Sequence, residues 1–568
     1  MRMTNKIMRN NAAYNINQNK ILQDKLTNQM TNQSKIVRPS DDPVVAIRAL
    51  RLRSNVTAVT QYNEKNAKDA EQWLSLTADA MDTVDQVLND LYKQATSAPN
   101  KFETADDLRI YLTQMKQLTA EFYSCANVDY AGRFVFSGYR TDLPVTFTAE
   151  DIKQMEEHPV SYNIDENFGF HDISRISYTD YTKVEEGLVP NPPGSKPDVP
   201  KDIDDVHSYE QAVNNTTLYR FRISYNNLDS LGKGGDLKIT MPDGTKIVAT
   251  AKDKDGNVQL DADNKPIVTT TPVDEDGNPL TGVQVPEIKE FGDQEEAYKA
   301  IADGTFTGIA YIPSSGELVF SEDICNEKFH EKVFEGGGTF QVNYDKSNWK
   351  NGDINPVHYF KCIETKNVAA KGETPDWRKT SYNTQRDQGR DQDIYYDVGY
   401  NQQIQVNTRA DEIFTHDVQR DMDDFEHYLN QLQAIETLKK DLETKKGEFP
   451  EDSDEYKDIM NRIEGADKAW DYIRENIHTK FENQITKYQK YMDDSRVAMT
   501  DNATRGSRLE LIATRLTNQQ ATFKELQQDN EGIDITEVAV EMTSAELTYN
   551  AALMATGKIM QTNLMNYI

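Results

Sequence analysis

Residues that commonly do chemistry are sparse in this chain, and they do not fall at the spacings that catalysis or metal binding requires. The eight histidines are scattered, and no two of them lie four residues apart, as a helical zinc site would need. Cys125, Cys325 and Cys362 are too far apart to predict a metal site or a disulfide framework. The sequence also lacks a Walker loop, a dinucleotide-binding fingerprint, an HExxH helix and a GxSxG elbow. We therefore predict a protein that is not an enzyme and that uses no cofactor.

Two acidic segments and one glycine run come closest to ligand-binding motifs. Asp253-Lys-Asp255-Gly256-Asn257 and Asp274-Glu-Asp276-Gly277-Asn278 contain calcium-type ligands, but neither has the ligand order and later glutamate of an EF-hand loop. Hairpin turns explain both segments better. The run Gly336-Gly-Gly338 precedes an expected strand at 339–344, so it does not place a phosphate at a helix N-terminus. The carboxylates of the helical segments are interpreted as a solvated surface.

Composition narrows the classes of partner. The net charge is −31, which argues against nucleic acid because phosphate binding needs basic clusters. Residues 1–60 carry ten Lys/Arg and three Asp/Glu, whereas residues 509–568 carry three and eight, so opposite charges favour pairing of the two ends. No apolar run is long enough to predict membrane insertion. The first residues lack the apolar core of a secretory signal, so we expect any export to proceed without a cleaved signal.

Both ends of the chain have the apolar periodicity of long helices. From residue 67 onward, apolar and small residues recur at a and d positions for about four heptads, which favours helices that wind round one another. The stripe consists of Ala67, Ala70, Leu74, Thr77, Met81, Val84, Leu88, Leu91, Ala95 and Ala98. A second stripe near the other end consists of Leu509, Ile512, Leu516, Gln519, Phe523 and Leu526. The two ends must therefore find each other while the middle of the chain loops out.

The terminal segments, 1–35 and 536–568, carry thin stripes rich in Asn, Gln and Thr. Such stripes are too sparse for a well-buried monomer core, so we expect these ends to bury against other subunits and residues 1–42 to be disordered in the monomer. The predicted assembly interface consists of Ile7, Tyr14, Ile21, Leu74, Met81, Leu88, Leu91, Leu516, Phe523, Val538, Met542, Ile559 and Leu564.

Local signals set the expected boundaries of the first half. In Arg38-Pro39-Ser40-Asp41-Asp42-Pro43, the first proline disfavours helix at the preceding residue, Asp42 is a good N-cap, and Pro43 suits the first helical position. The hexapeptide therefore ends one segment and begins a helix at about 43–98. A second helix is expected at about 104–128, followed after Gly132 by a strand at 133–139.

The middle and the C-terminal half follow a different pattern. Residues 140–400 predict short strands and turns, with hairpins at 236–250 and 308–320 and a proline-rich linker at 189–200. Helices are then expected at about 404–448, 454–530 and 536–563.

The expected fold class is α+β. We predict an elongated molecule whose N- and C-terminal segments pair as an α-helical coiled-coil bundle, with an inserted mainly-β outer domain. The expected domains are a terminal helix at 1–42, one half of the helical core at 43–139, a variable β-rich domain at 140–400, the other half of the core at 401–530 with a helical insertion near 438–476, and a terminal helix at 531–568.

This order of parts resembles the flagellin superfamily, and within it the flagellar hook-associated protein 3 family of hook–filament junction proteins. Three segments are similar to that family: the hexapeptide from Arg38 to Pro43 with the helix start that follows it, Asn127-Val-Asp-Tyr-Ala-Gly-Arg-Phe-Val-Phe-Ser-Gly-Tyr139, and the ending Asn563-Leu-Met-Asn-Tyr-Ile568. The family motif therefore includes Arg38, Pro39, Ser40, Asp41, Asp42, Pro43, Gly132, Arg133 and Phe134. The resemblance covers about residues 1–140 and 400–568.

The resemblance implies a structural adaptor of the bacterial flagellum that joins hook to filament and assembles as a homo-oligomeric ring. It implies export to the flagellum outside the cell, and partners that include the first hook–filament junction protein, flagellin and a cytoplasmic export chaperone. Two alternatives stay open at this point. One is a flagellin, the filament subunit itself, and the other is a secreted adhesin or enzyme with its activity in residues 140–400 on a coiled-coil stalk.

Overall fold

A computed structural model describes most of the chain and divides it into two compact units. The described residues are 5–36, 38–98, 104–187, 208–231, 235–252, 258, 267–274, 278–280, 284–369, 374–384 and 392–561. Unit 1 comprises residues 1–72, 395–405 and 504–568, and unit 2 comprises residues 73–394 and 406–503. The linker at 189–200, the acidic segment at 253–257 and the chain end at 563–568 lie outside the described residues.

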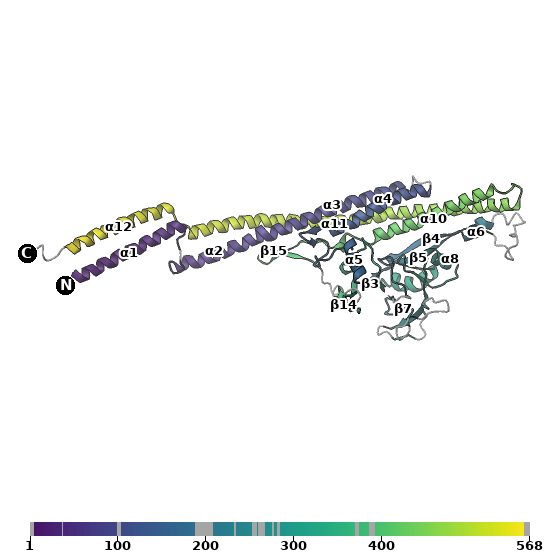
Figure 1. Cartoon of the computed structure of the whole chain (residues 1–568), viewed down its shortest axis with the longest axis horizontal. Helices are drawn as coiled ribbons and strands as arrows, with labels where there is room; N and C mark the ends of the chain where they lie inside the picture. The colour runs from purple at the N-terminus through teal and green to yellow at the C-terminus, as the bar shows by residue number, and fades with distance from the viewer. Residues whose placement is uncertain are drawn as a thin grey trace, which may run out of the picture. The chain divides into compact units, whose positions relative to one another are not determined.

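Unit 1 is built from helices at the two ends of the chain. Its elements are α1 (Asn5–Asn32), α2 (Pro43–Gln61), the π-helical segment η1 (Tyr62–Ala67), the first residues of α3 (Lys68–Ser97), the hairpin strands β15 (Tyr395–Gly399) and β16 (Gln402–Gln405), the last part of α11 (Asp454–Glu531), and α12 (Ile535–Gln561). Figure 1 shows α1 and α12 side by side. A small apolar core of Leu26, Val538 and Ala545 joins them.

The heptad stripe predicted from residue 67 is confirmed as a buried seam. Each of its ten positions, from Ala67 to Ala98, is at most 3% exposed. The predicted helix at 43–98 is also confirmed, with one local difference, because η1 interrupts the α-helical hydrogen bonding between α2 and α3. The polar side chains of η1 are held in place: Asn63 donates to Thr517 at 3.1 Å, and Asn66 donates to the carbonyl of Asp397 at 2.7 Å.

Unit 2 combines the rest of α3 with α4 (Ala105–Ser124), α10 (Asp417–Lys446) and the first part of α11. Thr104 and Asp107 form a capping box at the start of α4, which satisfies backbone N–H groups that the helix cannot pair internally. The helix expected at about 104–128 is present, and Leu108, Met115 and Phe122 on it are fully buried.

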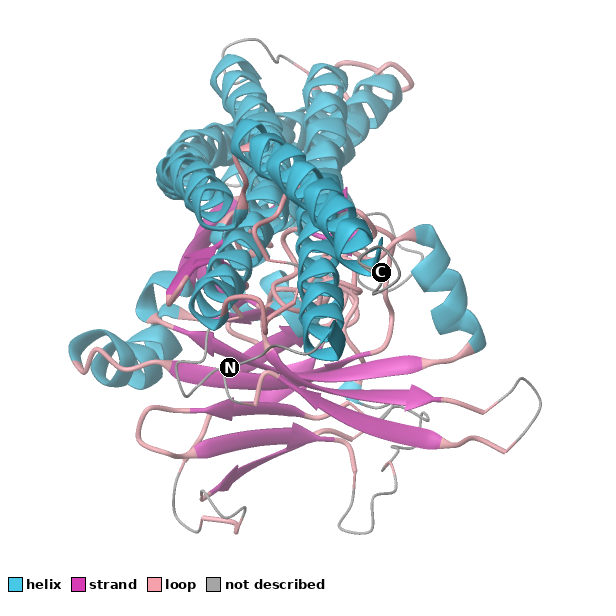
Figure 2. Ribbon diagram, turned by 90° about the vertical axis from the view of Figure 1, so that its left-hand side faces the viewer, coloured by secondary structure: helices cyan, strands magenta, loops and turns pink. Residues whose placement is uncertain are grey.

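Two antiparallel-rich sheets form the β domain of unit 2 (Figure 2). In the seven-stranded sheet the order is β14 (Trp377–Tyr382), β13 (Lys361–Asn367), β3 (Val160–Phe168), β12 (Phe340–Lys346), β6 (Leu237–Thr240), β7 (Lys246–Thr250) and β8 (Thr269–Val273). In the five-stranded sheet the order is β4 (Ile173–Asp180), β5 (Asn214–Arg222), β11 (Glu317–Phe320), β10 (Ile309–Ile312) and β9 (Ile288–Glu290). Within the five-stranded sheet only β9 and β10 pair in parallel.

Short helices accompany the sheets: α5 (Ala149–Glu157), α6 (Thr182–Glu186), α7 (Ser208–Ala212), α8 (Gln294–Ala302) and α9 (Glu322–Ile324), which leads into the π-helical segment η7 (Cys325–Glu335). Both hairpins predicted from turn residues are confirmed: β6 pairs with β7 and β10 pairs with β11. The strand after the glycine run is confirmed as β12. The predicted fold class is therefore confirmed as mixed helix and sheet, with long helices at both ends and a β-rich middle.

Two predictions about secondary structure were wrong. Residues 402–405 form β16 rather than the start of a helix, and α10 begins only at Asp417. The backbone of this segment is instead engaged in the β15–β16 hairpin, whose turn holds Asn401 at φ +53°. The strand predicted at 133–139 is limited to β2 (Arg133–Phe134), paired with β1 (Asp129–Tyr130), because the chain then turns at Gly138, where φ is +64°.

The insertion near 438–476 forms a helical hairpin from the end of α10 and the start of α11. An apolar cluster of Leu442, Ile459 and Ile463 holds its two arms together. Arg462 donates to the carbonyls of Val184 and Glu185 at the end of α6, at 2.9 and 2.7 Å. Lys468 donates to the carbonyl of Glu210 in α7 at 2.6 Å. The hairpin therefore supplies cations to the C-terminal ends of two short helices, where they are stabilising.

A buried ionic network joins the five-stranded sheet to the helices of unit 2. Arg220 on β5 pairs with Glu317 at 2.6 Å and with Asp424 on α10 at 2.7 Å. Arg222 pairs with the same two carboxylates at 3.2 and 2.8 Å, and Lys480 on α11 reaches Asp424 at 2.5 Å. These nearby cations hold the pKa of Asp424 well below its usual range despite burial. Carboxylates interpreted as a solvated surface are therefore, at this place, part of the core.

None of the helices within the described ranges is both long and apolar enough to cross a bilayer.

The network makes Asp424 a sensitive position. We expect Asp424→Asn to lower the free energy of unfolding of unit 2 by about 3–5 kcal/mol, because Glu317 is then the one fully buried carboxylate paired with the two buried guanidinium groups, and one buried positive charge is left without a buried counter-charge. Urea denaturation of the whole chain, followed by far-UV circular dichroism, measures this loss. Asp441→Asn on the exposed side of the same helix is the matched control and should change stability by less than about 0.5 kcal/mol. Equal effects of the two substitutions would contradict the assignment.

Candidate assembly interface

The hexapeptide at 38–43 forms a compact turn that begins α2. The amide of Arg38 donates to the Asp41 carboxylate at 2.8 Å, and the amide of Asp41 donates back to the Arg38 carbonyl at 2.9 Å. The Asp42 carboxylate accepts hydrogen bonds from Val44 and Val45 at 3.0 and 3.1 Å. The predicted N-cap and the predicted proline at the first helical turn are both confirmed.

Contacts between the two ends of the chain surround this turn. The amide of Lys35 donates to the Glu531 carbonyl at 2.7 Å, and the Asn530 amide group donates to the Val45 carbonyl at 3.2 Å. Arg53 donates hydrogen bonds to the Glu531 carboxylate from both Nε and a terminal nitrogen, and its Nε lies 2.9 Å from Oε1. The hydrogen bonds that Arg53 donates to the Glu531 carboxylate raise the pKa of Arg53. Residues nearly five hundred positions apart are therefore held in one register.

The second family segment forms the tight β1–β2 hairpin of unit 2. Ala131 and Gly132 at its tip have φ of +52° and +79°, as a two-residue hairpin turn requires. The Arg133 guanidinium lies over the rings of Trp73 and Tyr130, 5.1 and 5.6 Å from their centroids. Phe134 is half-buried beside it. This hairpin therefore packs on Trp73, which is fully buried in α3.

The predicted interface residues divide into four groups by their exposure. Leu74, Met81, Leu88, Leu91, Leu516 and Val538 are buried within the chain itself. Phe523 and Met542 are half-buried, and the exposed fractions of Ile7, Tyr14 and Ile21 are 48%, 64% and 56%. Leu564 and the side chain of Ile559 lie outside the described residues. The first group cannot offer an open surface while the chain holds this fold. Its place between subunits, like the domain boundaries and the monomer disorder of residues 1–42, stays a prediction.

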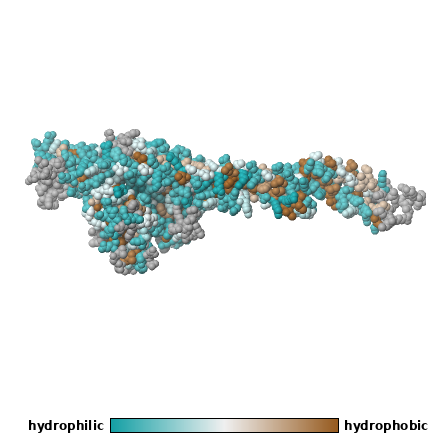
Figure 3. All heavy atoms as spheres, turned by 180° about the vertical axis from the view of Figure 1, so that it is seen from behind, coloured by the Kyte–Doolittle hydropathy of each residue, from teal (hydrophilic) through white to brown (hydrophobic). Residues whose placement is uncertain are grey.

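Other exposed apolar residues of unit 1 were not predicted. Val540, Leu547 and Met554 recur every seven residues along α12 and are 66%, 72% and 73% exposed. Val44, Ile47 and Leu50 begin α2 with comparable exposure, and Leu511 on α11 is 74% exposed. Figure 3 shows apolar side chains gathered along the helices of unit 1. The seven-residue spacing of these residues on α12 could have predicted an exposed apolar stripe. The prediction instead used the neighbouring stripe that contains Val538 and Met542.

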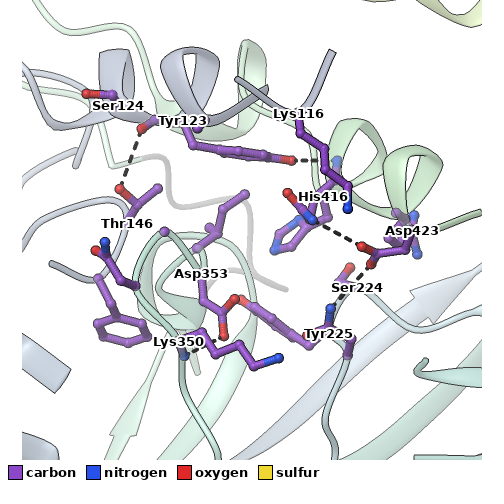
Figure 4. A pocket seen from close by; sticks show the side chains of 18 of the residues that line it. Lys116, Tyr123, Ser124, Thr146, Ser224, Tyr225, Lys350, Asp353, His416 and Asp423 are labelled. Carbon is purple, nitrogen blue, oxygen red and sulfur yellow. Dashed lines mark hydrogen bonds between the residues drawn. The ribbon is translucent and has the colours of Figure 1, made fainter. Parts of the chain in front are cut away.

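Unit 2 contains a cavity of about 660 Å³, lined by both polar and apolar groups, between α4, the start of α10 and loops of the β domain (Figure 4). Lys116, Tyr123, Tyr225, Asp353, His416 and Asp423 are among the residues that line it. His416 is 8% exposed, and its ring packs against the rings of Tyr225, Tyr359 and Phe360. Burial and the nearby Arg420 lower the pKa of His416 to about 3, so the ring is neutral at pH 7.

The cavity does not assemble a catalytic pair from the residues that line it. The Ser224 hydroxyl donates to Glu166 at 2.5 Å rather than to His416. Burial raises the pKa of Glu166, and the Tyr344 hydroxyl also donates to it, at 3.0 Å. No group of three or more His, Cys, Asp or Glu residues that could hold a metal ion occurs in the described part of the chain. The one acidic segment partly described, 274–278, is closed by hydrogen bonds from Asn278 to Asp274 at 2.8 and 3.2 Å, as in a turn.

Comparison with known proteins supports the resemblance found in the sequence. Residues 3–141 match the family model of the bacterial flagellin N-terminal helical region. The chain is 29% identical over 115 residues to flagellar hook-associated protein 3 of Escherichia coli K12, covering 20% of this chain and 36% of that protein. It is 25% identical over 172 residues to the protein of the same name from Salmonella typhimurium LT2, covering 30% of this chain and 54% of that protein. The chain thus spans between a third and about half of the length of these relatives.

Solved structures give matches of low overall similarity. The crystal structure of Xanthomonas campestris FlgL aligns with 83% of this chain and 98% of that chain, at 10% identity and a TM-score of 0.25. The crystal structure of flagellar hook-associated protein 3 from Legionella pneumophila aligns with the same shares at 8% identity and a TM-score of 0.19. The predicted resemblance to hook-associated protein 3 within the flagellin superfamily is confirmed by the sequence matches.

Buried histidines predict how stability depends on pH. Burial lowers the pKa of His416 to about 3 and that of His358 to about 4, below the ordinary 6.5. The contribution of these neutral histidines to the free energy of unfolding is therefore complete above pH 6.5. It decreases as the pH falls, by about 2 kcal/mol for each histidine at pH 5. Burial raises the pKa values of Glu166 and Asp423, so protonation of these two carboxyl groups increases the free energy of unfolding as the pH falls below their pKa in the folded state.

We expect His416→Phe to flatten the dependence of the urea midpoint on pH between 7 and 5, whereas His171→Gln at an exposed position should leave it unchanged. Parallel curves for wild type and His416→Phe would contradict this prediction.

Proposed function

We propose that this chain is a structural protein of the bacterial flagellum that joins the hook to the filament and assembles with copies of itself through its terminal helices. The match of residues 3–141 to the flagellin N-terminal helical region and the similarity to hook-associated protein 3 support this proposal. The chain acts by packing and not by catalysis, and its place is outside the cell on the flagellum.

The observation that carries the proposal is the pairing of α1 with α12. Among the residues that the structure describes, the core between these helices has three buried members, and Ile533 and Met542 pack against it, while large apolar side chains on both helices face solvent. Exposed contiguous apolar surface of this kind marks a protein interface. At about 25 cal/mol per Å² of apolar area removed from water, packing between subunits would supply what this small core lacks. We infer that other subunits, arranged as a ring, cover these faces.

The route to that ring follows from the same surface. An apolar face exposed before assembly promotes unwanted association, so a cytoplasmic export chaperone would cover α12 until export. The terminal helices would then become fully ordered only as they pack, with the area buried between subunits offsetting the ordering entropy. The neighbours in the finished structure would be the first hook–filament junction protein on one side and flagellin on the other.

Deletion of the gene tests this proposal. We expect hooks without filaments by electron microscopy, together with flagellin monomers shed into the medium, because filament subunits arrive and find no junction to build on. Hooks without filaments and without shed monomer would instead make this chain a flagellin. Intact filaments would overturn both flagellar assignments. Reintroduction of the wild-type gene should restore filaments and serves as the control.

The exposed stripe on α12 allows a sharper test. We expect Leu547→Glu to reduce incorporation into the flagellum at least about tenfold, since a buried unpaired carboxylate at a subunit contact costs more than about 1.4 kcal/mol. Thr548→Glu, at the next exposed position, adds the same charge outside the stripe and should assemble normally. Immunoblots of purified hook–basal bodies measure incorporation, and circular dichroism checks that both variants fold. Equal incorporation of the two variants would overturn the role of this stripe.

A further inference from the structure

The paired helices α1 and α12 each present an apolar stripe on the side turned away from the other helix. On α12, Val540 and Leu547 each follow a residue of the small core, Val538 or Ala545, by two positions. Residues two positions apart on an α-helix point about 200° apart, because each residue turns the helix by about 100°. The exposed α12 stripe of Val540, Leu547 and Met554 therefore lies on the side of α12 opposite the core.

The same relation holds on α1. Ile21 precedes the half-buried Gln23 by two positions, and Gln23 lies one turn before Leu26 of the core. Ile7 and Tyr14 continue the line of Ile21 at intervals of seven residues, and the exposed fractions of these three residues lie between 48% and 64%. This α1 stripe therefore faces away from α12. Each α1–α12 pair thus has two outer apolar sides, one on each helix.

A contact in the core fixes how the two helices are aligned along their length. The bridge between Ser34 and Gly532 joins the end of α1 to the start of α12, so the two helices run antiparallel. Leu26 shares its core with both Val538 and Ala545. It therefore lies level with the middle of that interval, near residues 541 and 542.

The two stripes match rung by rung on this alignment. Five residues further from the bridge on each helix are Ile21 and Leu547, and seven residues beyond these are Tyr14 and Met554. Both helices rise by the same length per residue, about 1.5 Å. Ile21 is therefore level with Leu547, and Tyr14 is level with Met554. A neighbouring pair of helices placed alongside can bring one stripe against the other without any shift along the helix axis.

The charges on the two helices are of opposite sign. α1 bears four cations and one anion and α12 bears three anions and one cation, all on exposed residues: Lys6, Arg9, Lys20, Lys25 and Asp24 on α1, and Glu537, Glu541, Glu546 and Lys558 on α12. Within the described residues, no ion pair joins these two helices of one subunit, and the Arg53–Glu531 pair lies outside both. The charges are therefore available to a contact with another chain.

A groove beside the α1 stripe adds to this preference for an acidic partner. It has a volume of about 810 Å³, and its lining includes Arg9, Tyr14 and Lys20 of α1 and Tyr549 of α12 and contains no acidic side chain. A helix packed along Tyr14 would bring its flanking side chains beside these two cations. Glutamates on that helix would be favoured there, because opposite charges attract most strongly at short range.

We propose that the α12 stripe of one subunit packs on the α1 stripe of the next, so that copies of this chain join head to tail. The stripes share their seven-residue spacing and their levels, and they carry opposite charges, and a second copy of this chain supplies all three features together. The contact is heterologous, since it uses two different surfaces of each subunit, and such contacts form rings when the rotation between copies closes. This inference rests on the proposed function, because it specifies which surfaces meet in the proposed ring.

Cross-linking between introduced cysteines in assembled flagella tests the contact. Cys125, Cys325 and Cys362 are buried, so they do not compete for a thiol-reactive reagent. A chain with both Ile21→Cys and Leu547→Cys, expressed in cells that lack the wild-type gene, should give a ladder of covalent multimers. The ladder is read by denaturing electrophoresis after purified hook–basal bodies are treated with a short bismaleimide. Each substitution alone should give monomers, because neither stripe meets its own copy.

Two further variants make the test specific. Tyr14→Cys with Met554→Cys, one heptad along both stripes, is an independent second pair and should give the same ladder. Ile21→Cys with Thr548→Cys is the matched control, since Thr548 is exposed and adjoins Leu547 outside the stripe. We expect at least about tenfold less multimer from this control, because neighbouring positions on a helix point about 100° apart.

The possible failures are distinguishable. Dimers formed by Leu547→Cys alone would show that α12 stripes meet each other, and would overturn the head-to-tail contact. Incorporation of either cysteine pair without a ladder would also overturn it and would assign the stripes to a different flagellar protein. Absence of the wild-type chain from purified hook–basal bodies would instead overturn the proposed function, and this inference with it.

Discussion

The structure depends on contacts between segments at opposite ends of the sequence. Neither the α1 stripe nor the α12 stripe can bury itself, and helices with such sparse apolar faces gain most of their stability from packing. The Arg53–Glu531 pair and the backbone contacts of Lys35 fix how the two ends meet, across a separation of 478 residues in the case of the ion pair. The hexapeptide turn places α2 so that this meeting can occur. A chain closed in this way presents everything between its ends as one large insertion.

When the two ends of the chain pair, the strongest apolar stripe becomes buried within the subunit, and the weaker stripes stay largely exposed. All ten seam positions from Ala67 to Ala98 are buried, whereas the described parts of α1 and α12 share a core of three buried residues. The stability of the chain and its capacity to associate are therefore assigned to different residues. A substitution in the seam would damage the fold of each subunit, while a substitution on the α12 stripe would damage contacts that exist only between subunits.

Much of this arrangement could be predicted because its signals are local. Seven-residue periodicity identified the seam, Asp42 followed by proline identified the start of α2, and turn residues such as Asp243-Gly244 identified hairpins. The failures have a common physical cause, since they concern residues whose environment is set by distant partners. Ile404 joins a hairpin within a unit of helices, and Asp424 meets Arg220 some two hundred residues away. A carboxylate on a helix looks the same in sequence whether it faces water or a buried guanidinium. The neutral His416 has no sequence signal either, because burial in the folded chain is the main cause of its lowered pKa.

The helical hairpin at 438–476 attaches the inserted β domain to the helices of unit 2 through polar contacts. Arg462 and Lys468 of this hairpin donate hydrogen bonds to carbonyl groups of two short helices of the domain, α6 and α7. A Cβ atom added at Gly465 would lie 3.0 Å from the Val184 side chain. Such close approach leaves little room for the domain to shift against α11 within unit 2. The buried network around Asp424 fixes a second point of attachment, from β5 to α10 and α11. Two separated attachments resist rotation, which one attachment does not. Within unit 2, the β domain is therefore attached to the helices at two separated places.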